Sequence, residues 1–290
     1  MSSVNLVGKH IVVTGANSGI GYVTAFELAQ LGAKVTLVCR DQERGQAAVE
    51  RIRAASRTAD VELMLCDMAD QRSIQAFCRA FRARHRALDV LVNNAGAYLA
   101  QRAVTPENLE ATFAINHMGY FLTARGLLPS LRAAGAARIV NVASFGHYFG
   151  RINWSDINYE DRRYSALGAY CASKLMNIQF TRTLAEVLAD DKIDVNCLHP
   201  GSIRSGFARK ENDAFGWLVK LGGFALSSSE KGAKTSVFLA SQPEVSGVSG
   251  EYFVRCKPTR PSRSARDGAQ AERLWQLSES LMVHDPLDDI

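Results

Sequence analysis

The sequence predicts an α/β fold, a doubly wound parallel sheet of about seven strands with helices on both faces. Short runs rich in β-branched residues alternate with longer amphipathic stretches through the first half of the chain, and a glycine-rich turn follows the first run. Repeated β-α-β units require right-handed crossovers, which give a parallel sheet covered on both sides. The expected elements are strands at 11–14, 34–38, 61–65 and 90–93, and helices at 21–31, 44–55 and 73–85.

The second half of the chain completes the sheet. We expect a buried strand at 137–143, a long helix at 169–189, and further strands at 194–198 and 251–254. A C-terminal helix at 269–283 should pack on the domain, because its apolar residues have helical spacing. The basic loop at 257–266 is expected to be a solvated connection rather than a binding patch.

Residues 205–229 differ from the rest of the chain. They are rich in glycine, mixed in charge, and carry the apolar residues Phe215, Trp217, Leu218, Val219, Leu221, Phe224 and Leu226. Two interpretations are open: a mobile lid or short helix over the site, or the ordinary core contacts of a helix.

Composition indicates one catalytic domain over residues 1–290. The chain is 47% hydrophobic, enough for one large core, and no shift in composition marks a second domain. Its 34 basic and 29 acidic residues suit an anionic cofactor but fall short of a nucleic-acid footprint. Six scattered cysteines predict reduced, buried thiols, and six dispersed histidines lack metal-ligand spacing, so we expect no metal site.

The N-terminal segment argues against secretion, and together with the reduced cysteines it predicts a cytoplasmic protein. It passes directly into the first strand, with neither the apolar stretch nor the cleavage site of a signal peptide. No run approaches the roughly 18 apolar residues of a membrane span, so we expect no transmembrane segment. Peripheral contact with a membrane stays open.

The turn after the first strand predicts a dinucleotide site. Gly15, Gly19 and Gly21 follow a strand and open a helix, so the backbone can approach a pyrophosphate and direct amide groups at its charge. Asn17 and Ser18 can add hydrogen bonds within the turn, and Ile20 completes the motif.

The end of the second strand favours NADP(H) over NAD(H). An NAD enzyme tends to place a carboxylate here for the ribose 2′-hydroxyl, whereas this chain has Cys39 followed by Arg40. The planar guanidinium of Arg40 suits a 2′-phosphate. The alternative is that Arg40 is a surface cation and Asp41 turns toward the ribose.

Other strand ends supply further candidate cofactor contacts. Asp67, beside Met68, could accept a hydrogen bond from an adenine amine. A run of small residues follows the fourth strand, and a Pro-Gly turn near residue 200 could present groups to a carboxamide. Turn chemistry alone could also explain these residues. The candidates are Asp67, Met68, Asn94, Ala95, Gly96, Pro200, Gly201, Ile203 and Ser205.

Tyr170 and Lys174 carry the expected chemistry. Residues four apart lie on one face of a helix, so the Lys174 ammonium can approach the same pocket as the Tyr170 phenol. A neighbouring cation stabilises a phenolate and lowers the tyrosine pKa from its ordinary value of about 10. Tyr170 could then exchange a proton with an alcohol or carbonyl oxygen.

These motifs together resemble the short-chain dehydrogenase/reductase family, whose fold is a Rossmann fold. The glycine turn, the Asn-Asn-Ala-Gly segment, Tyr170 with Lys174, and the Pro-Gly turn occur in the family's order over residues 7 to about 255. The resemblance implies a catalytic tetrad of Asn116, Ser144, Tyr170 and Lys174. It implies that Asn116 fixes a local kink and a water, that Ser144 holds the developing oxyanion, and that Lys174 also binds the nicotinamide ribose.

A closer likeness is to the retinol-dehydrogenase group, carried by the sequence around Tyr170, by residues 244–253 and by the tail at 271–275. It implies an NADP(H)-dependent oxidoreductase that interconverts a lipophilic aldehyde or ketone and its alcohol. The N-terminal membrane anchor of many members is not evident, so the particular substrate stays open. Family members often pair through the helix expected at 169–189, which suggests a homodimer or homotetramer, although its extra apolar residues could equally be core.

Two other functions use the same fold. A regulatory protein could bind NADPH without consuming it, because fold alone does not establish activity. The second possibility is a reductase of another substrate class, which would act on a carbon–carbon double bond, a sugar or a fatty acyl carrier. The complete tetrad favours an enzyme, and the apolar residues of 205–229 disfavour a sugar.

Overall fold

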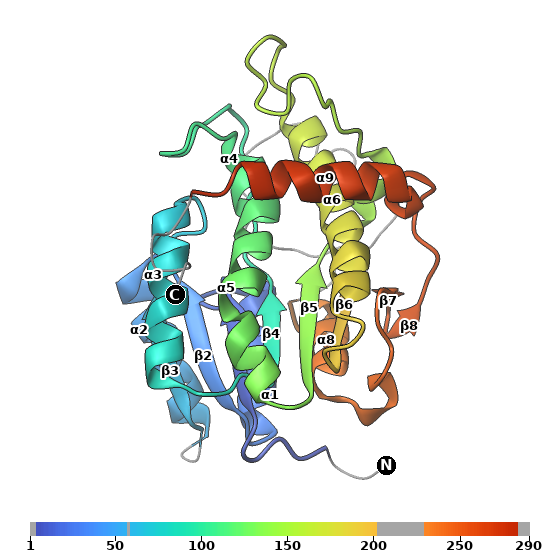
Figure 1. Cartoon of the computed structure of the whole chain (residues 1–290). Helices are drawn as coiled ribbons and strands as arrows, with labels where there is room; N and C mark the ends of the chain where they lie inside the picture. Colours follow the sequence, from blue (N-terminus) through green and yellow to red (C-terminus); the bar gives the residue numbers. More distant parts are fainter. Residues whose placement is uncertain (1–3, 57–58, 202–228, 284–290) are drawn as a thin grey trace.

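A central parallel sheet organises the molecule (Figure 1). The computed structural model describes residues 4–56, 59–201 and 229–283. Within these residues the sheet has eight strands, and every neighbouring pair is parallel except the last, which is antiparallel. In spatial order they are β3 (Val61–Leu65), β2 (Lys34–Cys39), β1 (His10–Thr14), β4 (Val90–Asn93), β5 (Ala137–Val142), β6 (Ile193–His199), β7 (Tyr252–Val254) and β8 (Lys257–Pro258).

The predicted doubly wound sheet is therefore confirmed, with one strand more than the seven expected. The additional strand, β8, has two residues and pairs with β7 through Val254 and Lys257. So short a strand shows no alternation of apolar and polar residues, and it lies in the basic loop that we expected to be a solvated connection.

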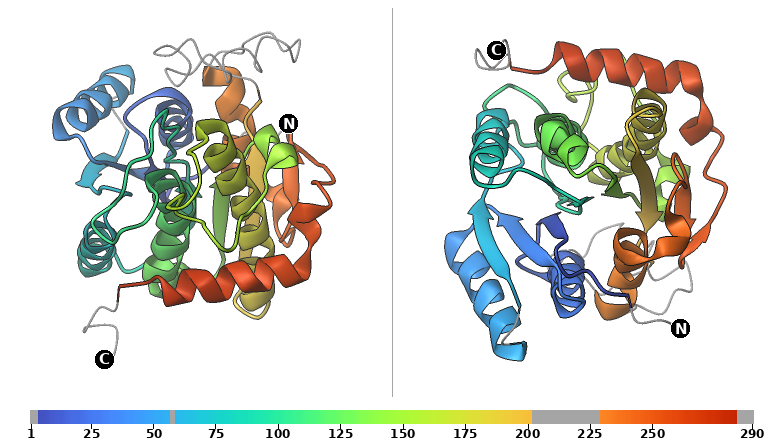
Figure 2. Two further views of the ribbon diagram at one scale, coloured as in Figure 1. Left: turned by 90° about the horizontal axis from the view of Figure 1, so that it is seen from above. Right: turned by 60° about the horizontal axis from the view of Figure 1, so that its bottom comes forward.

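Helices cover both faces of the sheet (Figure 2). One face carries α1 (Gly19–Gln30), α2 (Gln42–Ala55) and α8 (Ser229–Ser241), and the other carries α3 (Gln71–Arg84), α5 (Gly119–Ala133) and α6 (Ala166–Val187). Asp41 and Asp70 cap α2 and α3, because each carboxylate accepts a backbone N–H of the first turn. Both caps fix where the chain leaves a strand end and enters a helix.

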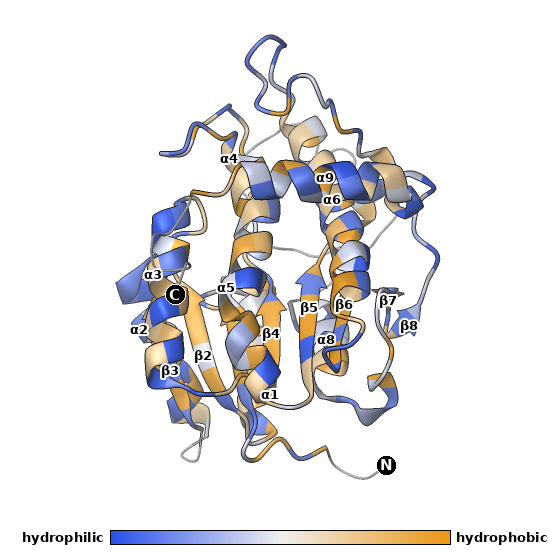
Figure 3. Ribbon diagram, in the orientation of Figure 1, coloured by the Kyte–Doolittle hydropathy of each residue, from blue (hydrophilic) through white to orange (hydrophobic). Residues whose placement is uncertain are grey.

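Two cores result, one on each side of the sheet. The central strands are largely apolar, as Figure 3 shows, because helices bury both of their faces. Phe81, Leu127 and Phe180 belong to the core under α3, α5 and α6. Leu28 and Ile52 belong to the core under α1, α2 and α8. Five of the six cysteines are buried and all six are free thiols.

A π-helical turn interrupts the helix that leads to the centre of the molecule. The short helix α4 (Ala111–Phe113) passes into this turn, η1 (Ala114–Met118), which continues as α5. Glu110 caps α4 by accepting the backbone N–H groups of Thr112 and Phe113, each at 2.8 Å. π-Helical turns inside α-helices often mark functional sites. Asn116 lies in this one.

The expected C-terminal helix is present as α9 (Gly268–Ser280), which lies across α6 (Figure 1). The Ser278 hydroxyl lies 2.7 Å from Nε2 of His117 in η1, within hydrogen-bond distance. The apolar residues of α6 that we considered for pairing between chains are buried in this chain: Leu175, Ile178, Leu184 and Leu188. They are core residues, the alternative left open by the sequence.

Two further observations concern the predictions for a transmembrane segment and for the lid. None of the described helices is long and apolar enough to cross a membrane. The expected lid, 205–229, lies outside the described residues except for Ser229, the first residue of α8.

Candidate active site

The candidate site lies at the carboxyl ends of the central strands. The strand order reverses between β1 and β4, and such a switch point is where open α/β sheets bind ligands. Thr14, the last residue of β1, connects these strands: its Oγ1 accepts the backbone N–H groups of Asn94 at 2.9 Å and of Ala95 at 3.0 Å. The Asn94 amide returns a bond of 2.8 Å to the Thr14 carbonyl. The two predicted cofactor loops are therefore held together.

Glycine is required in the turn after β1. Gly15 has φ of +66° and Gly19 has φ of +57°, a left-handed conformation that other residues rarely adopt. A Cβ on Gly15 would lie 2.8 Å from the Cα of Ala95, and a Cβ on Gly21 would collide with the Gly15 carbonyl and the Asn94 amide. The turn thus packs backbone against backbone and leaves α1 pointing its first amides at the crevice, which fits a pyrophosphate.

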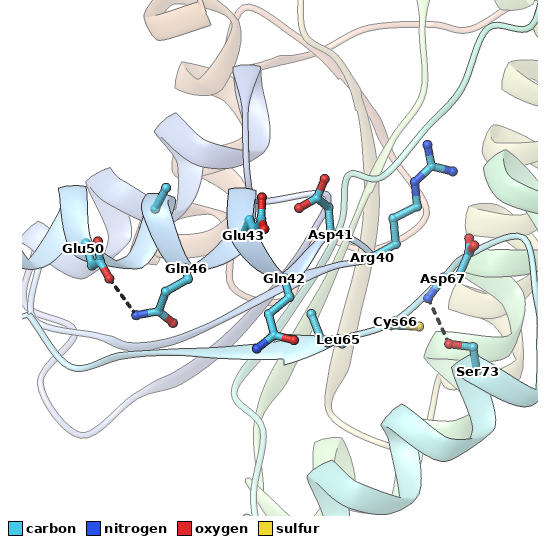
Figure 4. Close-up of a pocket in the computed structure, with 11 residues that line it drawn as sticks. Arg40, Asp41, Gln42, Glu43, Gln46, Glu50, Leu65, Cys66, Asp67 and Ser73 are labelled. Atoms are coloured by element: carbon cyan, nitrogen blue, oxygen red, sulfur yellow. Dashed lines mark hydrogen bonds between the residues drawn. The ribbon is translucent and has the colours of Figure 1, made fainter.

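A groove continues from this turn along the carboxyl ends of β2 and β3 (Figure 4). It is lined by residues of both strand ends and of the first turns of α2, and has a volume of about 1050 Å³. Arg40 is exposed there and forms no hydrogen bond or ion pair with the described part of the chain. Asp41 caps α2, since its Oδ1 accepts the Arg44 N–H at 2.9 Å. Its carboxylate is therefore engaged, whereas the Arg40 guanidinium has no partner among the described residues.

Asp67, which follows β3, also lines the groove (Figure 4). Its backbone N–H donates to Ser73 Oγ at 2.9 Å, and its Oδ1 accepts the Ala69 N–H at 2.9 Å. The side chain therefore shapes its own turn, the alternative weighed for it, and its remaining oxygen has no described partner. Met68 is buried beside Gly119 at the start of α5.

Asn116 is held from two sides. Its Oδ1 accepts the Ala97 N–H at 2.6 Å, and its Nδ2 donates to the Ala97 carbonyl and to Ser173 Oγ, both at 2.9 Å. Ser173 in turn donates to the Tyr170 carbonyl at 2.8 Å. The loop after β4 and helix α6 are thus joined through a completely buried amide.

Lys174 projects from α6 toward the end of β5. Its Nζ donates to the Val142 carbonyl at 2.9 Å, and the side chain is almost completely buried. Asn177 Nδ2 and the Tyr120 hydroxyl also donate to this carbonyl, at 3.3 and 3.4 Å. Gly96 lies beside the ammonium, since a Cβ there would be 3.6 Å from Nζ, an ordinary van der Waals contact.

Ser144 and Tyr170 meet across Gly146. A Cβ on Gly146 would lie 3.5 Å from both the Ser144 hydroxyl oxygen and the Tyr170 ring, so this glycine borders both groups. The Ser144 side chain hydrogen-bonds the Tyr170 hydroxyl, and its Oγ accepts the Gly146 N–H at 3.1 Å. The Tyr98 ring contacts Tyr170 edge to face, with centroids 5.9 Å apart.

The electrostatics differ from the sequence-based expectation for Tyr170. Although the ring keeps part of its surface accessible, desolvation raises the pKa of Tyr170 to about 12, and the Ser144 hydrogen bond offsets only part of this rise. Burial also lowers the pKa of Lys174 to about 7. The ammonium lies 5.9 Å from the centroid of the Tyr170 ring. Desolvation therefore outweighs the stabilisation of the phenolate that we expected from this lysine.

The sequence missed the partners that hold the tetrad. None of Ser173, Val142, Tyr120 and Asn177 was predicted as a contact of the tetrad, since a hydroxyl, a strand carbonyl and core polar groups show no such contact in the sequence. Of the Pro-Gly turn, Pro200 and Gly201 are described, and Gly201 has φ of +88°. Ile203 and Ser205 lie outside the described residues.

Comparison with known proteins identifies the family. The model of the family described as short chain dehydrogenase matches residues 9–215. The chain belongs to this family. It is thus an oxidoreductase that acts on CH–OH and carbonyl groups with a nicotinamide cofactor.

Individual relatives agree with this membership. Human retinol dehydrogenase 12 is 39% identical over 281 residues, covering 97% of this chain and 88% of the relative. Human retinol dehydrogenase 13 is 36% identical over 292 residues, covering 97% and 86%. The solved structure of an uncharacterised protein from Mycobacterium paratuberculosis has a TM-score of 0.79 and 33% identity, covering 97% and 96%. L-Sorbose reductase from Gluconobacter frateurii, solved with NADPH and L-sorbose, has a TM-score of 0.71 and 27% identity, covering 87% and 96%.

Proposed function

We propose that the protein interconverts a lipophilic aldehyde or ketone and its alcohol with NADP(H), using Tyr170 as the acid and base. The observation that carries this proposal is the convergence of four side chains at the carboxyl ends of β4 and β5. Asn116 and Lys174 are held by buried hydrogen bonds, while Ser144 and Tyr170 share one. The packing of the fold does not by itself require these four side chains to lie together.

The described residues fit an NADP(H) cofactor. The turn at Gly15 and Gly19 offers backbone amides to a pyrophosphate, and the collision that any side chain on Gly21 would cause shows how closely this backbone packs. Arg40 supports NADP(H) over NAD(H), because its guanidinium is exposed beside the groove and no described residue pairs with it. Asp41, the alternative contact for an unphosphorylated ribose, is committed to the cap of α2.

The chain's own groups account for the remaining steps of the reaction. A bound NADPH supplies the hydride. The Ser144 and Tyr170 hydroxyls hold the carbonyl oxygen between them, and Tyr170 gives its proton to that oxygen as negative charge develops. With a pKa of about 12 in the free protein, Tyr170 is protonated at neutral pH and ready to act as an acid. The Lys174 ammonium stabilises the phenolate left behind.

An exposed aromatic surface beside Ser144 supports a lipophilic substrate. The 3-10 helix η2 (Phe145–Phe149) directly follows Ser144, and its side chains Phe145, Tyr148 and Phe149 are 43, 43 and 57% exposed. Large exposed aromatic residues in one short segment form an apolar surface that suits an apolar ligand. The names of the retinol dehydrogenases point to the same class, whereas L-sorbose reductase represents a polar substrate on this fold.

The test of the proposal is NADPH consumption with a panel of lipophilic aldehydes and ketones, retinal included, and with sugars for comparison. We expect turnover with the lipophilic carbonyls. NADPH binding without turnover of any carbonyl would instead support the NADPH-sensing function. Turnover confined to sugars would refute the substrate class.

The cofactor preference has its own test. Replacing Arg40 with alanine should weaken NADPH binding by about 1.5–3 kcal/mol, the value of a charge-assisted hydrogen bond, and leave NADH binding nearly unchanged. Arg84, exposed at the end of α3, provides the matched control, and Arg84→Ala should affect neither cofactor. Equal losses for both cofactors in Arg40→Ala would refute the assignment. The cytoplasmic location and the homodimer or homotetramer stay predictions.

A further inference from the structure

A second cluster of chemically active side chains lies at the end of the sheet opposite the active site. His10 begins β1, Glu62 lies in the first half of β3, and His85 follows the last residue of α3. Their ligand atoms, one from each residue, all lie within 4.8 Å of one another. The active site occupies the carboxyl ends of the strands, so this cluster takes no part in the chemistry proposed above.

The spacing of these atoms suits one small cation. Nε2 of His85 lies 2.8 Å and Nε2 of His10 lies 3.7 Å from Oε1 of Glu62. Zinc binds imidazole nitrogen and carboxylate oxygen at about 2.0–2.2 Å, so two ligands of a tetrahedral zinc lie about 3.3 Å apart. The two separations bracket this value. Small rotations of the side chains would bring all three atoms around one ion.

The protein leaves one of these atoms without a hydrogen bond. His85 Nε2 is enclosed and makes no hydrogen bond to a described residue, although Oε1 of Glu62 lies 2.8 Å away. Enclosed polar atoms are nearly always paired, and the exceptions point to a missing ion or water. This nitrogen faces the carboxylate that would share the ion with it.

The surroundings hold the ligands in place. Phe81 packs against both imidazole rings, with centroids 5.0 and 4.9 Å apart, and fixes their orientation. Thr36 Oγ1 donates to Glu62 Oε1 at 2.8 Å and so orients the carboxylate.

We propose that His10, Glu62 and His85 bind a zinc ion, with water as the fourth ligand. Two imidazoles and one carboxylate form a donor set that zinc favours over magnesium or calcium, which prefer oxygen alone. The ion would join the end of α3 to β1 and β3, and would act on stability rather than on turnover. The dispersed positions of the histidines had led us to expect no metal site.

One charge opposes the ion. This charge is the ammonium of Lys34, whose Nζ lies 4.0 Å from Glu62 Oε1. The Thr36 hydroxyl, which is uncharged, also lies close to the proposed ion, with its Oγ1 2.8 Å from His10 Nε2. The Lys34 side chain is 35% exposed and can turn into solvent when zinc binds. Removing its charge should therefore strengthen zinc binding, an effect that a site elsewhere on the protein would not show.

The experiment is a titration of the full chain with Zn²⁺ by calorimetry, with Co²⁺ as a spectroscopic probe and the melting temperature as a second readout. We expect one equivalent to bind, to raise the melting temperature, and to give the visible spectrum of tetrahedral Co²⁺ with nitrogen ligands. His85→Gln and Glu62→Gln should each weaken binding by about tenfold or more. Lys34→Gln should tighten it.

Cys256→Ser is the control, because Cys256 is the free cysteine that is not fully buried and could bind zinc by itself. It should leave the affinity unchanged. Unchanged affinity in both Glu62→Gln and His85→Gln, or loss of binding in Cys256→Ser, would overturn the proposal. If His85→Gln fails to fold, Glu62→Gln still decides the matter, because glutamine retains an oxygen for the Thr36 hydroxyl.

Discussion

Replacing Lys174 with methionine should remove a large pH-dependent penalty from the stability of the folded chain. Burial lowers the pKa of Lys174 from 10.5 to about 7, so folding brings a charged group into a place that disfavours it. The difference between the two pKa values corresponds to about 5 kcal/mol. Methionine is similarly long and apolar, and the Val142 carbonyl keeps Asn177 and Tyr120 as donors. The variant should therefore fold.

The direction of the effect follows from where the proton is bound. Below about pH 7 the lysine is charged in both states, and the whole penalty acts on wild type. Between about pH 7 and 10.5 the folded chain has lost the proton that the unfolded chain retains, so the stability contributed by this residue rises with pH. Each pH unit in that window adds about 1.4 kcal/mol.

The assay is urea unfolding of wild type and Lys174→Met at a series of pH values, without cofactor. The free energy of unfolding of wild type minus that of the variant should rise by about 3 kcal/mol between about pH 6.5 and 9.5. Effects of all other titrating groups cancel in this difference. Lys234→Met, at an exposed position of α8, should show no such rise. Parallel curves for wild type and Lys174→Met would refute the reasoning.

Two further predictions concern the cofactor turn and the pH dependence of turnover. Gly21→Ala should destabilise the protein by about 1–3 kcal/mol and weaken NADPH binding, since its methyl group would collide with the Gly15 carbonyl, whereas Gly268→Ala, where the added methyl meets no atom, should do neither. Chemical denaturation and cofactor titration measure both effects, and an unaffected Gly21→Ala would contradict the packing of the turn. For carbonyl reduction, kcat/KM should fall as pH rises through about 7, because Lys174 then loses the charge that stabilises the Tyr170 phenolate. A flat profile between about pH 6 and 9 would argue against that role.

The parts of the fold that follow local rules could be predicted from the sequence. The β-branched runs predicted the ends of the first strands to within a residue or two, because continuous apolar runs of this length reflect burial on both faces. The glycine turn could also be predicted, since Gly15 and Gly19 occupy conformations that other residues avoid. The spacing of Tyr170 and Lys174 placed both on α6.

The remaining features depend on contacts between distant segments. The Val142 carbonyl that binds Lys174 is 32 residues away in the sequence, and Asn116 is joined to Ser173 over 57 residues. The tyrosine pKa was expected to fall because spacing reveals a nearby lysine but not the desolvation of both groups. Similarly, His10 and His85 come together only when α3 packs against the sheet.

The turnover of Tyr170→Phe tests the central claim most directly. The substitution removes the hydroxyl and keeps the ring that packs against Tyr98, so NADPH binding should be nearly intact. With a lipophilic aldehyde that wild type reduces, kcat should fall by about a hundredfold or more, the loss expected when a general acid is removed. Near-normal turnover in a variant that still binds NADPH would contradict the account.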